Sequence, residues 1–348
     1  MKHIVLIFVL LLPLFAKSVN EDKSGYSSSA VVFAYHRFGN SKYPSTNIKL
    51  EQFQYQLDYF EDNNYNVWPL SKIINHIIDK KPIPPKTVAL TIDDAYKTVF
   101  SGAYPMLKEK NYPFTVFVNT NPIDNKSINY MTWEQMRIMQ EHGAEFANHS
   151  LSHPFLLPYE NESNEVWKKR VKKEILKAQK RLQEEFGSKT NENPKLFSYT
   201  FGEYNIPMAD IVRELGFVGV AQVSGPVSQD SDLRAISRFA MSQTFATENG
   251  FKTKLNTLPL PIKSVSVEEP VIQDNNPPKL RIKLKERITR VGCFLSSGDR
   301  LEIDWISKTE FEIVADIKLK APRDRYTCTA PAKDGKWYWY SHLWIIKQ

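Results

Sequence analysis

Two short segments of the chain hold residue types that together could perform metal-assisted hydrolysis. Asp93 and Asp94 offer adjacent carboxylates, and His149 and His153 offer two imidazoles further along. On one helical turn, two histidines four residues apart would point to the same side and could share a metal ion. One carboxylate could complete the ligand set and leave its neighbour free to accept a proton from water. This combination predicts a hydrolase that uses a metal ion.

These residues follow predicted strands in a repeating strand–helix pattern. Apolar runs predict strands at 30–35, 88–92, 114–119, 144–147, 195–201 and 217–222, and helical spacing predicts helices at 50–63, 70–78, 103–110, 133–142, 166–186 and 209–215. Repeated units of this kind indicate parallel strands with helices outside. Because the candidate residues come at strand ends, we expect an α/β fold, with an irregular (β/α) barrel of parallel strands whose mouth carries the site.

The C-terminal part of the chain follows a different pattern. Prolines gather in residues 259–279, which predicts a linker or domain junction. Alternating residues predict strands at 280–284, 301–305, 311–317 and 337–346, and hence a small all-β, sandwich-like domain. We therefore divide the chain into a signal peptide (1–16), a flexible leader (17–29), a catalytic domain (30–262) and an accessory domain (263–348). The aromatic strip at 337–344 could bind sugar rings or fill the core of that domain.

The composition argues for an exported globular protein. Of the 348 residues, 42% are hydrophobic, which suits a packed core. Basic Lys2, a short apolar run and small Ala16 predict a secretory signal, with an uncleaved anchor as the alternative. No second apolar run is long enough to span a bilayer. We therefore expect a periplasmic or secreted protein with no stable membrane span after signal removal.

The charge limits the class of binding partner, and the cysteines bear on a possible disulfide. The net charge is +7, but lysines and arginines are scattered without a dense basic stretch, which argues against a nucleic-acid partner. Cys293 and Cys328 are the two cysteines. In an oxidising compartment they could form one disulfide, with two buried free thiols as the alternative. The sequence leaves the oligomeric state open.

The order and spacing of the two motifs resemble the polysaccharide deacetylases, the NodB-homology group of carbohydrate esterase family 4. That family has T-F-D-D-G, or a close variant, followed by H-S/T-x-x-H. This chain reads TIDDA at 91–95 and HSLSH at 149–153. The resemblance covers roughly residues 30–260. It implies a metal-dependent enzyme that removes N-acetyl groups from an N-acetylglucosamine-containing polysaccharide, either peptidoglycan or an exopolysaccharide.

Carried over position by position, the resemblance implies a role for each motif residue. Asp93 would be the general base, and Asp94, His149 and His153 would be the metal ligands. The chemistry agrees, because a divalent cation would neutralise one of two adjacent carboxylates. Two histidines and one aspartate with an open position suit zinc, although cobalt, nickel or iron could fit the same ligands.

A third segment, FSYTFGEY at 197–204, resembles the third motif of the family but has Thr200 where the family usually has proline. Its aromatic residues Tyr199, Phe201 and Tyr204 could form a wall for sugar rings. The alternative is a core strand that turns at Gly202.

The chain also departs from the family at the late histidine that usually acts as general acid, because no histidine occurs between His153 and His342. His36, which follows the first predicted strand, is the candidate acid, with a structural histidine as the alternative. Arg238 could hold Asp93 through a bidentate pair, with a surface ion pair as the alternative.

The missing histidine keeps two other functions open. One is an O-acetyl esterase acting on xylan-like chains, since an ester leaving group needs less help from an acid. The other is a non-catalytic glycan-binding or assembly protein that retains the metal triad.

Overall fold

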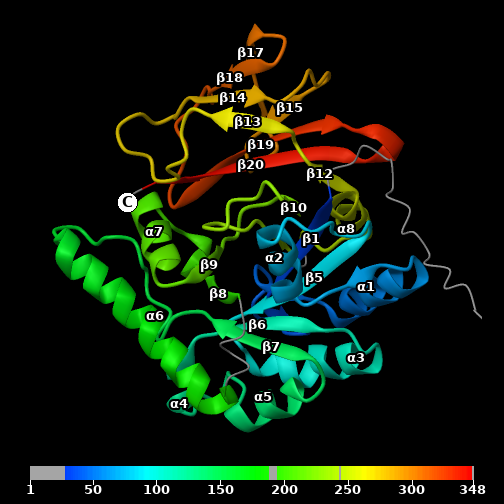
Figure 1. Ribbon diagram of the computed structural model, residues 1–348, viewed down its shortest axis with the longest axis vertical. Helices are drawn as coiled ribbons and strands as arrows, with labels where there is room; N and C mark the ends of the chain where they lie inside the picture. The colour runs from blue at the N-terminus through cyan, green and yellow to red at the C-terminus, as the bar shows by residue number, and fades with distance from the viewer. Residues whose placement is uncertain (1–27, 188–193, 243, 347–348) are drawn as a thin grey trace, which may run out of the picture.

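The computed structural model describes residues 28–187, 194–242 and 244–346. A nine-stranded sheet forms the centre of the N-terminal two thirds of these residues (Figure 1). Its main path runs through β10 (Val227–Ser228), β1 (Ser29–Tyr35), β5 (Thr87–Asp93), β6 (Phe114–Val118), β7 (Ala144–Asn148), β8 (Lys195–Ser198) and β9 (Phe217–Val220), with β4 (Asn66–Val67) on β5 and β11 (Phe239–Ala240) on β1. All of these strands except β10 pair in parallel. The predicted fold class is confirmed.

Helices follow most of these strands and cover the outside of the sheet (Figure 1). They are α1 (Leu50–Asp62), α2 (Leu70–Ile78), α3 (Tyr104–Glu109), α4 (Thr120–Asp124), α5 (Trp133–Gln140), α6 (Asn164–Phe186), α7 (Ile206–Glu214) and α8 (Glu248–Leu255). Short helical turns lie at Val99–Ala103, Thr200–Gly202 and Lys333–Gly335, and β2 (Arg37–Phe38) pairs with β3 (Asn47–Ile48).

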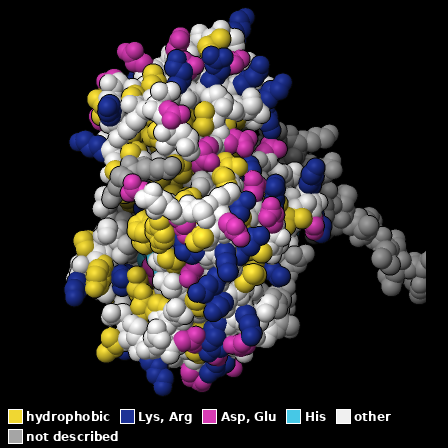
Figure 2. Space-filling model, turned by 90° about the vertical axis from the view of Figure 1, so that its left-hand side faces the viewer, with side chains coloured by type: hydrophobic (Ala, Val, Ile, Leu, Met, Phe, Trp, Pro, Cys, Tyr) yellow, Lys and Arg dark blue, Asp and Glu magenta, His cyan; other side chains and the backbone are white. Residues whose placement is uncertain are grey.

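Apolar strands explain why the sheet forms the core. Every residue of β5 and of β6 is buried, as expected for parallel strands covered on both faces. The long helix α6 buries one apolar stripe and turns its Lys- and Glu-rich side to solvent, as its pattern predicts. Figure 2 shows basic and acidic side chains interspersed over the face on which α6 lies.

A short segment, residues 236–240, closes the sheet into an irregular barrel. Ile236 forms a parallel bridge with Val220 at the end of β9, and β11 pairs with β1 on the other side. Arg238 lies between these two pairings, in the seam of the barrel. Its side chain is buried. The segment that completes the barrel therefore also places a guanidinium in the interior.

Two sheets pack over the barrel at the C-terminal end of the chain (Figure 1). One runs in the order β12 (Thr257–Pro259), β20 (Trp337–Ile345), β19 (Arg323–Pro331), β15 (Gly292–Phe294) and β16 (Arg300–Leu301); the other runs β13 (Ile262–Val265), β14 (Leu280–Leu284), β18 (Glu310–Ile313) and β17 (Ile303–Ser307). Buried residues of both sheets form one apolar cluster. Cys293 and Cys328 are directly opposite one another on β15 and β19 and form a disulfide.

Several expectations need correction. Ser29 belongs to β1, and the Ser28 hydroxyl bonds to the carbonyl of Ile83, so the last two residues of the predicted leader are built into the barrel. The predicted linker 259–279 contains β13, and strand β19 was missed. Trp339 packs on Phe239 of the barrel, with ring centroids 5.3 Å apart, so part of the aromatic strip serves packing.

The predicted signal peptide, 1–16, lies outside the described residues. The helices among the described residues include none that is both long and apolar enough to cross a bilayer. The division into domains stays a prediction, although β12, which precedes the expected boundary at 262, already pairs with β20 of the C-terminal sheet.

Candidate metal and catalytic site

The two histidines of the second motif come together through a loop. Residues 149–153 follow β7 and are not helical, so the expected helical turn is wrong. Ser150 and His153 take left-handed conformations, with φ of 69° and 58°. The loop is fixed by its own side chains, because Asn148 accepts the N–H of Ser150 and the Ser150 hydroxyl accepts the N–H of His153, both at 2.9 Å. The two histidines do lie on the same side, as predicted, but a loop and not a helical turn brings them together.

Asp94, His149 and His153 form a compact set of metal-ligand atoms. Asp94 Oδ1 lies 3.4 Å from His149 Nε2 and 3.3 Å from His153 Nε2, and the three ligand atoms all lie within 4.8 Å of one another. His149 Nδ1 lies 2.8 Å from the carbonyl oxygen of Ser198, which leaves Nε2 as the acceptor that faces Asp94. Two imidazoles and one carboxylate fit a divalent cation of the zinc type, with room for further ligands.

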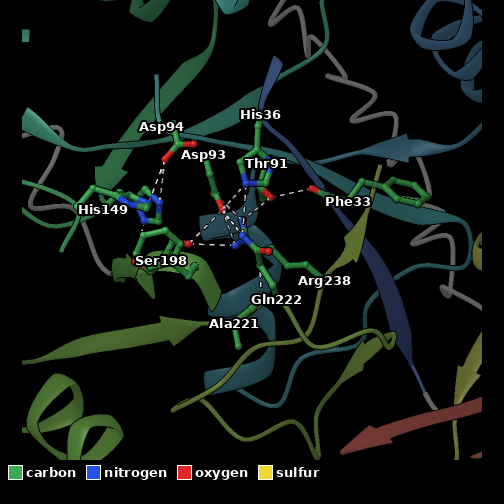
Figure 3. A network of polar contacts seen from close by, with 12 residues as sticks. Phe33, His36, Thr91, Asp93, Asp94, His149, Ser198, Ala221, Gln222 and Arg238 are labelled. Carbon is green, nitrogen blue, oxygen red and sulfur yellow. Dashed lines mark hydrogen bonds and ion pairs between the residues drawn. The ribbon is translucent and has the colours of Figure 1, made fainter. Parts of the chain in front are cut away.

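Asp93 points away from the triad into the barrel, where Arg238 holds it (Figure 3). The guanidinium donates to both carboxylate oxygens, at 2.7 and 2.8 Å. It also donates to the Thr91 and Ser198 hydroxyls, at 3.1 and 2.9 Å, and to the carbonyl of Ala221 at 3.0 Å. The expected bidentate pair is therefore present, and it is completely buried rather than a surface ion pair.

The electrostatics of the two carboxylates reflect this arrangement. Burial opposes ionisation of Asp93, but the charge and hydrogen bonds of Arg238, together with the nearby imidazoles of His149 and His36, outweigh burial and hold the pKa of Asp93 well below its ordinary value. For Asp94, burial is again outweighed, by the hydrogen bond to His149 and by the surrounding imidazoles, and its pKa falls to about 2. Both groups are therefore carboxylates at neutral pH. Asp94 is set to bind a cation, while Asp93 is already paired.

His36 lies at the mouth of the barrel beside these groups. It follows β1, and its Nε2 is 3.9 Å from Asp93 Oδ2. Gln222, one of the residues that the sequence did not single out, donates to Asp93 Oδ2 at 3.3 Å and lies 3.4 Å from His36 Nε2. Burial lowers the pKa of His36, although the charges of Asp93 and Asp94 oppose this shift. The imidazole is therefore mainly neutral at neutral pH.

A cavity of about 570 Å³ opens over this centre. His36, Gln222 and the three candidate metal ligands line it, whereas Asp93 does not. Asp93 lies behind His36 and Gln222 and exposes none of its surface. Of the candidate acid–base groups, His36 therefore has the more direct access to the cavity.

Phe201 forms one wall of the cavity, as expected from the third motif. Its ring meets the edge of His153 at a centroid distance of 4.5 Å and stacks on Phe155 at 4.3 Å. Phe155 is 51% exposed, so the pair offers an apolar surface next to a candidate metal ligand. Gly202 permits this turn, because a Cβ there would lie 2.5 Å from the side chain of Gln222 and its φ is 73°. Phe155 was not identified from the sequence, although its position two residues after the histidine motif could have indicated that it lies near the site.

The other two aromatic residues of the third motif do not reach this cavity. Tyr199 is completely buried, donates to the carbonyl of Arg234 at 2.7 Å and stacks on Tyr204 at 5.0 Å. It has no free face for a sugar, so the expectation for Tyr199 is wrong. Tyr204 lines a separate cavity at the junction with the C-terminal sheets. The alternative, a core strand that turns at Gly202, describes Tyr199 correctly.

The C-terminal sheet contributes residues that sequence reasoning missed. Arg323, Asp324 and Arg325 at the start of β19 line the cavity, as do Ser296 and Leu343. No local motif marks these residues, and only the packing of the sheet on the barrel brings them to the site.

Comparison with known proteins agrees with this geometry. Residues 80–220 match the model of the family described as polysaccharide deacetylase. The resemblance to the polysaccharide deacetylases is confirmed. Among relatives of this family, the Bacillus subtilis protein YxkH is 26% identical over 213 residues, which cover 61% of this chain and 71% of that protein.

Two further relatives are named for one polymer. The poly-β-1,6-N-acetyl-D-glucosamine N-deacetylase of Staphylococcus epidermidis is 21% identical over 247 residues, 65% of this chain and 84% of that protein. The enzyme of the same name from Escherichia coli K12 is 22% identical over 227 residues, 55% of this chain but only 33% of that protein.

Solved deacetylase structures share the fold. The Streptococcus pyogenes deacetylase PplD superposes with a TM-score of 0.57 and 22% identity, over 66% of this chain and 99% of that one. IcaB from Ammonifex degensii gives 0.56 and 21%, over 65% of this chain and 97% of that one. In both cases nearly the whole solved chain is matched while about a third of this chain is not.

Proposed function

We propose that the protein is a metal-dependent deacetylase that removes N-acetyl groups from an N-acetylglucosamine-containing polysaccharide. The observation that carries the proposal is the cluster of Asp94, His149 and His153 at the base of an open cavity, with Asp93 and His36 directly beside it. Without a ligand function, Asp94 would not require two imidazoles aimed at one of its oxygens. The names of the relatives favour an amide substrate on this sugar.

The chemistry of the site follows from its donor set. A divalent cation held by Asp94, His149 and His153, most simply zinc, would activate water and polarise the acetamide carbonyl. Asp93 would accept the proton from water as general base, and Arg238 would keep it ionised and oriented. His36 would donate a proton to the departing sugar nitrogen. Phe201 and Phe155 would pack against a sugar ring near the acetamide.

One observation favours a different division of labour between two of these residues. His36 lines the cavity and is mainly neutral, whereas Asp93 is buried and strongly paired. His36 could therefore accept the proton from water while Asp93 orients its ring. Both versions use the same residues and predict the same products, acetate and a free amine.

We further propose that the protein is exported, to the periplasm or beyond the cell, where its polymer would be peptidoglycan or an exopolysaccharide. The N-terminal sequence supports export, and the disulfide between Cys293 and Cys328 fits an oxidising compartment.

The test is acetate release from N-acetylglucosamine oligomers and from purified peptidoglycan by protein loaded with zinc. We expect release by the wild type, loss after treatment with a chelator, and recovery on adding zinc back. Asp93→Asn should bind zinc stoichiometrically and release at least about 100-fold less acetate. Zinc bound without release from either substrate, while an O-acetylated oligomer is hydrolysed, would replace the proposal with an esterase. Glycan binding with no release at all would indicate a non-catalytic binding protein.

A further inference from the structure

The strand β19 forms a wall of the catalytic cavity although it lies in the C-terminal sheet. Its first three residues, Arg323, Asp324 and Arg325, line the same cavity as His149 and His153. About a third of this chain is not matched by the solved deacetylases on which it superposes.

Arg323 ties this wall to the barrel. Its guanidinium donates to the carbonyl of Phe201, the aromatic residue beside the candidate metal ligand His153. It also lies 3.9 Å from Glu203 Oε1, a longer contact, to a carboxyl group whose pKa is raised by burial. The arginine is thus held in place mainly by a neutral carbonyl, and 41% of its side chain remains exposed.

The guanidinium of Arg325 forms no ion pair with the neighbouring carboxylate of Asp324. Asp324 Oδ1 accepts the backbone N–H groups of Ser296 and Arg325, at 3.0 and 2.7 Å. Among the residues that the structure describes, no carboxylate makes an ion pair with the Arg325 guanidinium. A second cation, Lys254, lies close enough that burial and the charge of Arg325 together lower the pKa of Lys254 to about 8.

The wall therefore has an excess of positive charge. Of the residues of this wall that line the cavity, Arg323 and Arg325 supply two cations against the single carboxylate of Asp324. A bound divalent cation at Asp94 would make the cavity more positive still. A neutral polymer of N-acetylglucosamine gives no reason for such a charge, whereas guanidinium groups bind carboxylates strongly and with defined geometry.

We propose that Arg323 and Arg325 form a subsite for a carboxylate carried by the sugar next to the one that is deacetylated. This inference rests on the proposed function and specifies its substrate class: an N-acetylated glycan with an acidic substituent on a neighbouring residue. The C-terminal sheet then takes part in substrate choice.

The experiment compares two oligomers that differ in one charge. One is the tetramer of N-acetylglucosamine, and the other is the same tetramer with C6 of one sugar oxidised to a carboxylate. The wild type should show a kcat/KM at least about tenfold higher for the acidic oligomer, as expected for one charge-assisted hydrogen bond. Added salt should reduce this ratio, because screening weakens the attraction.

Substitutions test whether Arg325 causes the preference for the acidic oligomer. Arg325→Gln should bring the ratio of the two kcat/KM values close to one, and Arg325→Lys should keep part of it. Arg287→Gln is the matched control, because Arg287 is an exposed arginine of the same C-terminal region that does not line the cavity. A wild-type ratio near one, or an unchanged ratio in Arg325→Gln, would overturn the subsite.

A binding measurement separates failure of the subsite from failure of the enzyme. Calorimetric titration of Asp93→Asn with both oligomers needs no turnover, and it should show the same preference for the acidic one. If neither oligomer releases acetate with the wild type, the proposed function fails, and the two dissociation constants still decide the subsite. Equal release and equal binding would leave a deacetylase without this selectivity.

Discussion

Arg238 links the chemistry of Asp93 to the closure of the barrel. Its five hydrogen bonds reach Asp93, two hydroxyls and a carbonyl, and all of these partners are buried or backbone groups. Removing one member of a buried ion pair leaves the other charge uncompensated. We therefore expect this residue to control both stability and activity.

Replacing Arg238 by methionine should lower the free energy of unfolding by about 3–5 kcal/mol, because Asp93 is left buried without its partner. Acetate release should fall with it. Arg238→Lys keeps the charge but loses the planar guanidinium. Its stability and its acetate release should therefore lie between those of the wild type and of the methionine variant. Urea unfolding and acetate assays measure these effects. A methionine variant as stable as the wild type would show that the pair does not hold the seam.

His36→Gln tests which residue moves which proton. If His36 is the acid, the variant should lose about 100-fold or more in N-acetyl hydrolysis and much less on O-acetyl esters, whose leaving groups need little protonation. If His36 is the base, both activities should fall alike.

The comparison for His36→Gln uses matched N- and O-acetylated oligomers, with acetate as the common product. His76→Gln is the control, since His76 lies on α2, where its side chain contacts Pro82 and Trp68 and does not line the cavity. Full activity of His36→Gln on both substrates would remove His36 from the mechanism.

At the scale of elements, the disulfide joins strands that are already paired. Cys293 and Cys328 close a loop with a sequence separation of 35 residues. The chain-entropy model gives about 3–4 kcal/mol for a loop of this size, mainly by restricting the unfolded chain.

Replacing both cysteines by alanine should therefore lower the free energy of unfolding of the C-terminal sheets by about 3 kcal/mol. Urea unfolding of the double variant, compared with the oxidised wild type, measures the loss. Because β19 also walls the cavity, KM for the polymer should rise. An equal unfolding curve for both proteins would contradict the expected contribution.

Six strands of the barrel could be predicted because they are apolar runs between helical segments, whereas the two-residue strands β4, β10 and β11 were too short to be recognised. The same pattern placed Asp93, Asp94 and His149 correctly at strand ends. Strand β19 was not predicted, because it begins with Arg323-Asp324-Arg325 directly after a proline, and such a sequence is typical of a loop.

Two features of the site could not be predicted from local sequence. The left-handed residues of the 149–153 loop depend on side-chain bonds that spacing does not reveal. Gln222 and Arg325 reach the cavity through tertiary packing, the first from the end of β9 and the second from the C-terminal sheet. Arg238 was found because it lies in the stretch that takes the place of the late histidine motif of the family.

For the whole molecule, His342 makes stability depend on pH. It lies on β20 with a buried Nε2 that has no partner among the described residues, and its ring packs against Trp344. Burial lowers its pKa to about 4. The unfolded chain, with a histidine pKa of about 6.5, then binds more protons than the folded protein between these two values.

This histidine should therefore leave stability unaffected above pH 6.5 and reduce it as the pH falls from about 6.5 towards 4, by up to about 3 kcal/mol. Urea unfolding at a series of pH values measures the slope. His342→Gln removes the titrating group and should flatten that part of the curve. A slope equal in both proteins would assign the acid sensitivity to other groups.

The positive wall at β19 also bears on what a polymer looks like after many turnovers. Each reaction would turn a neutral acetamide into an ammonium group that stays on the chain. When that sugar moves into the place beside Arg323 and Arg325, like charges repel. Neighbouring units would then be poor substrates, and the amines would be spread at intervals along the glycan instead of forming blocks.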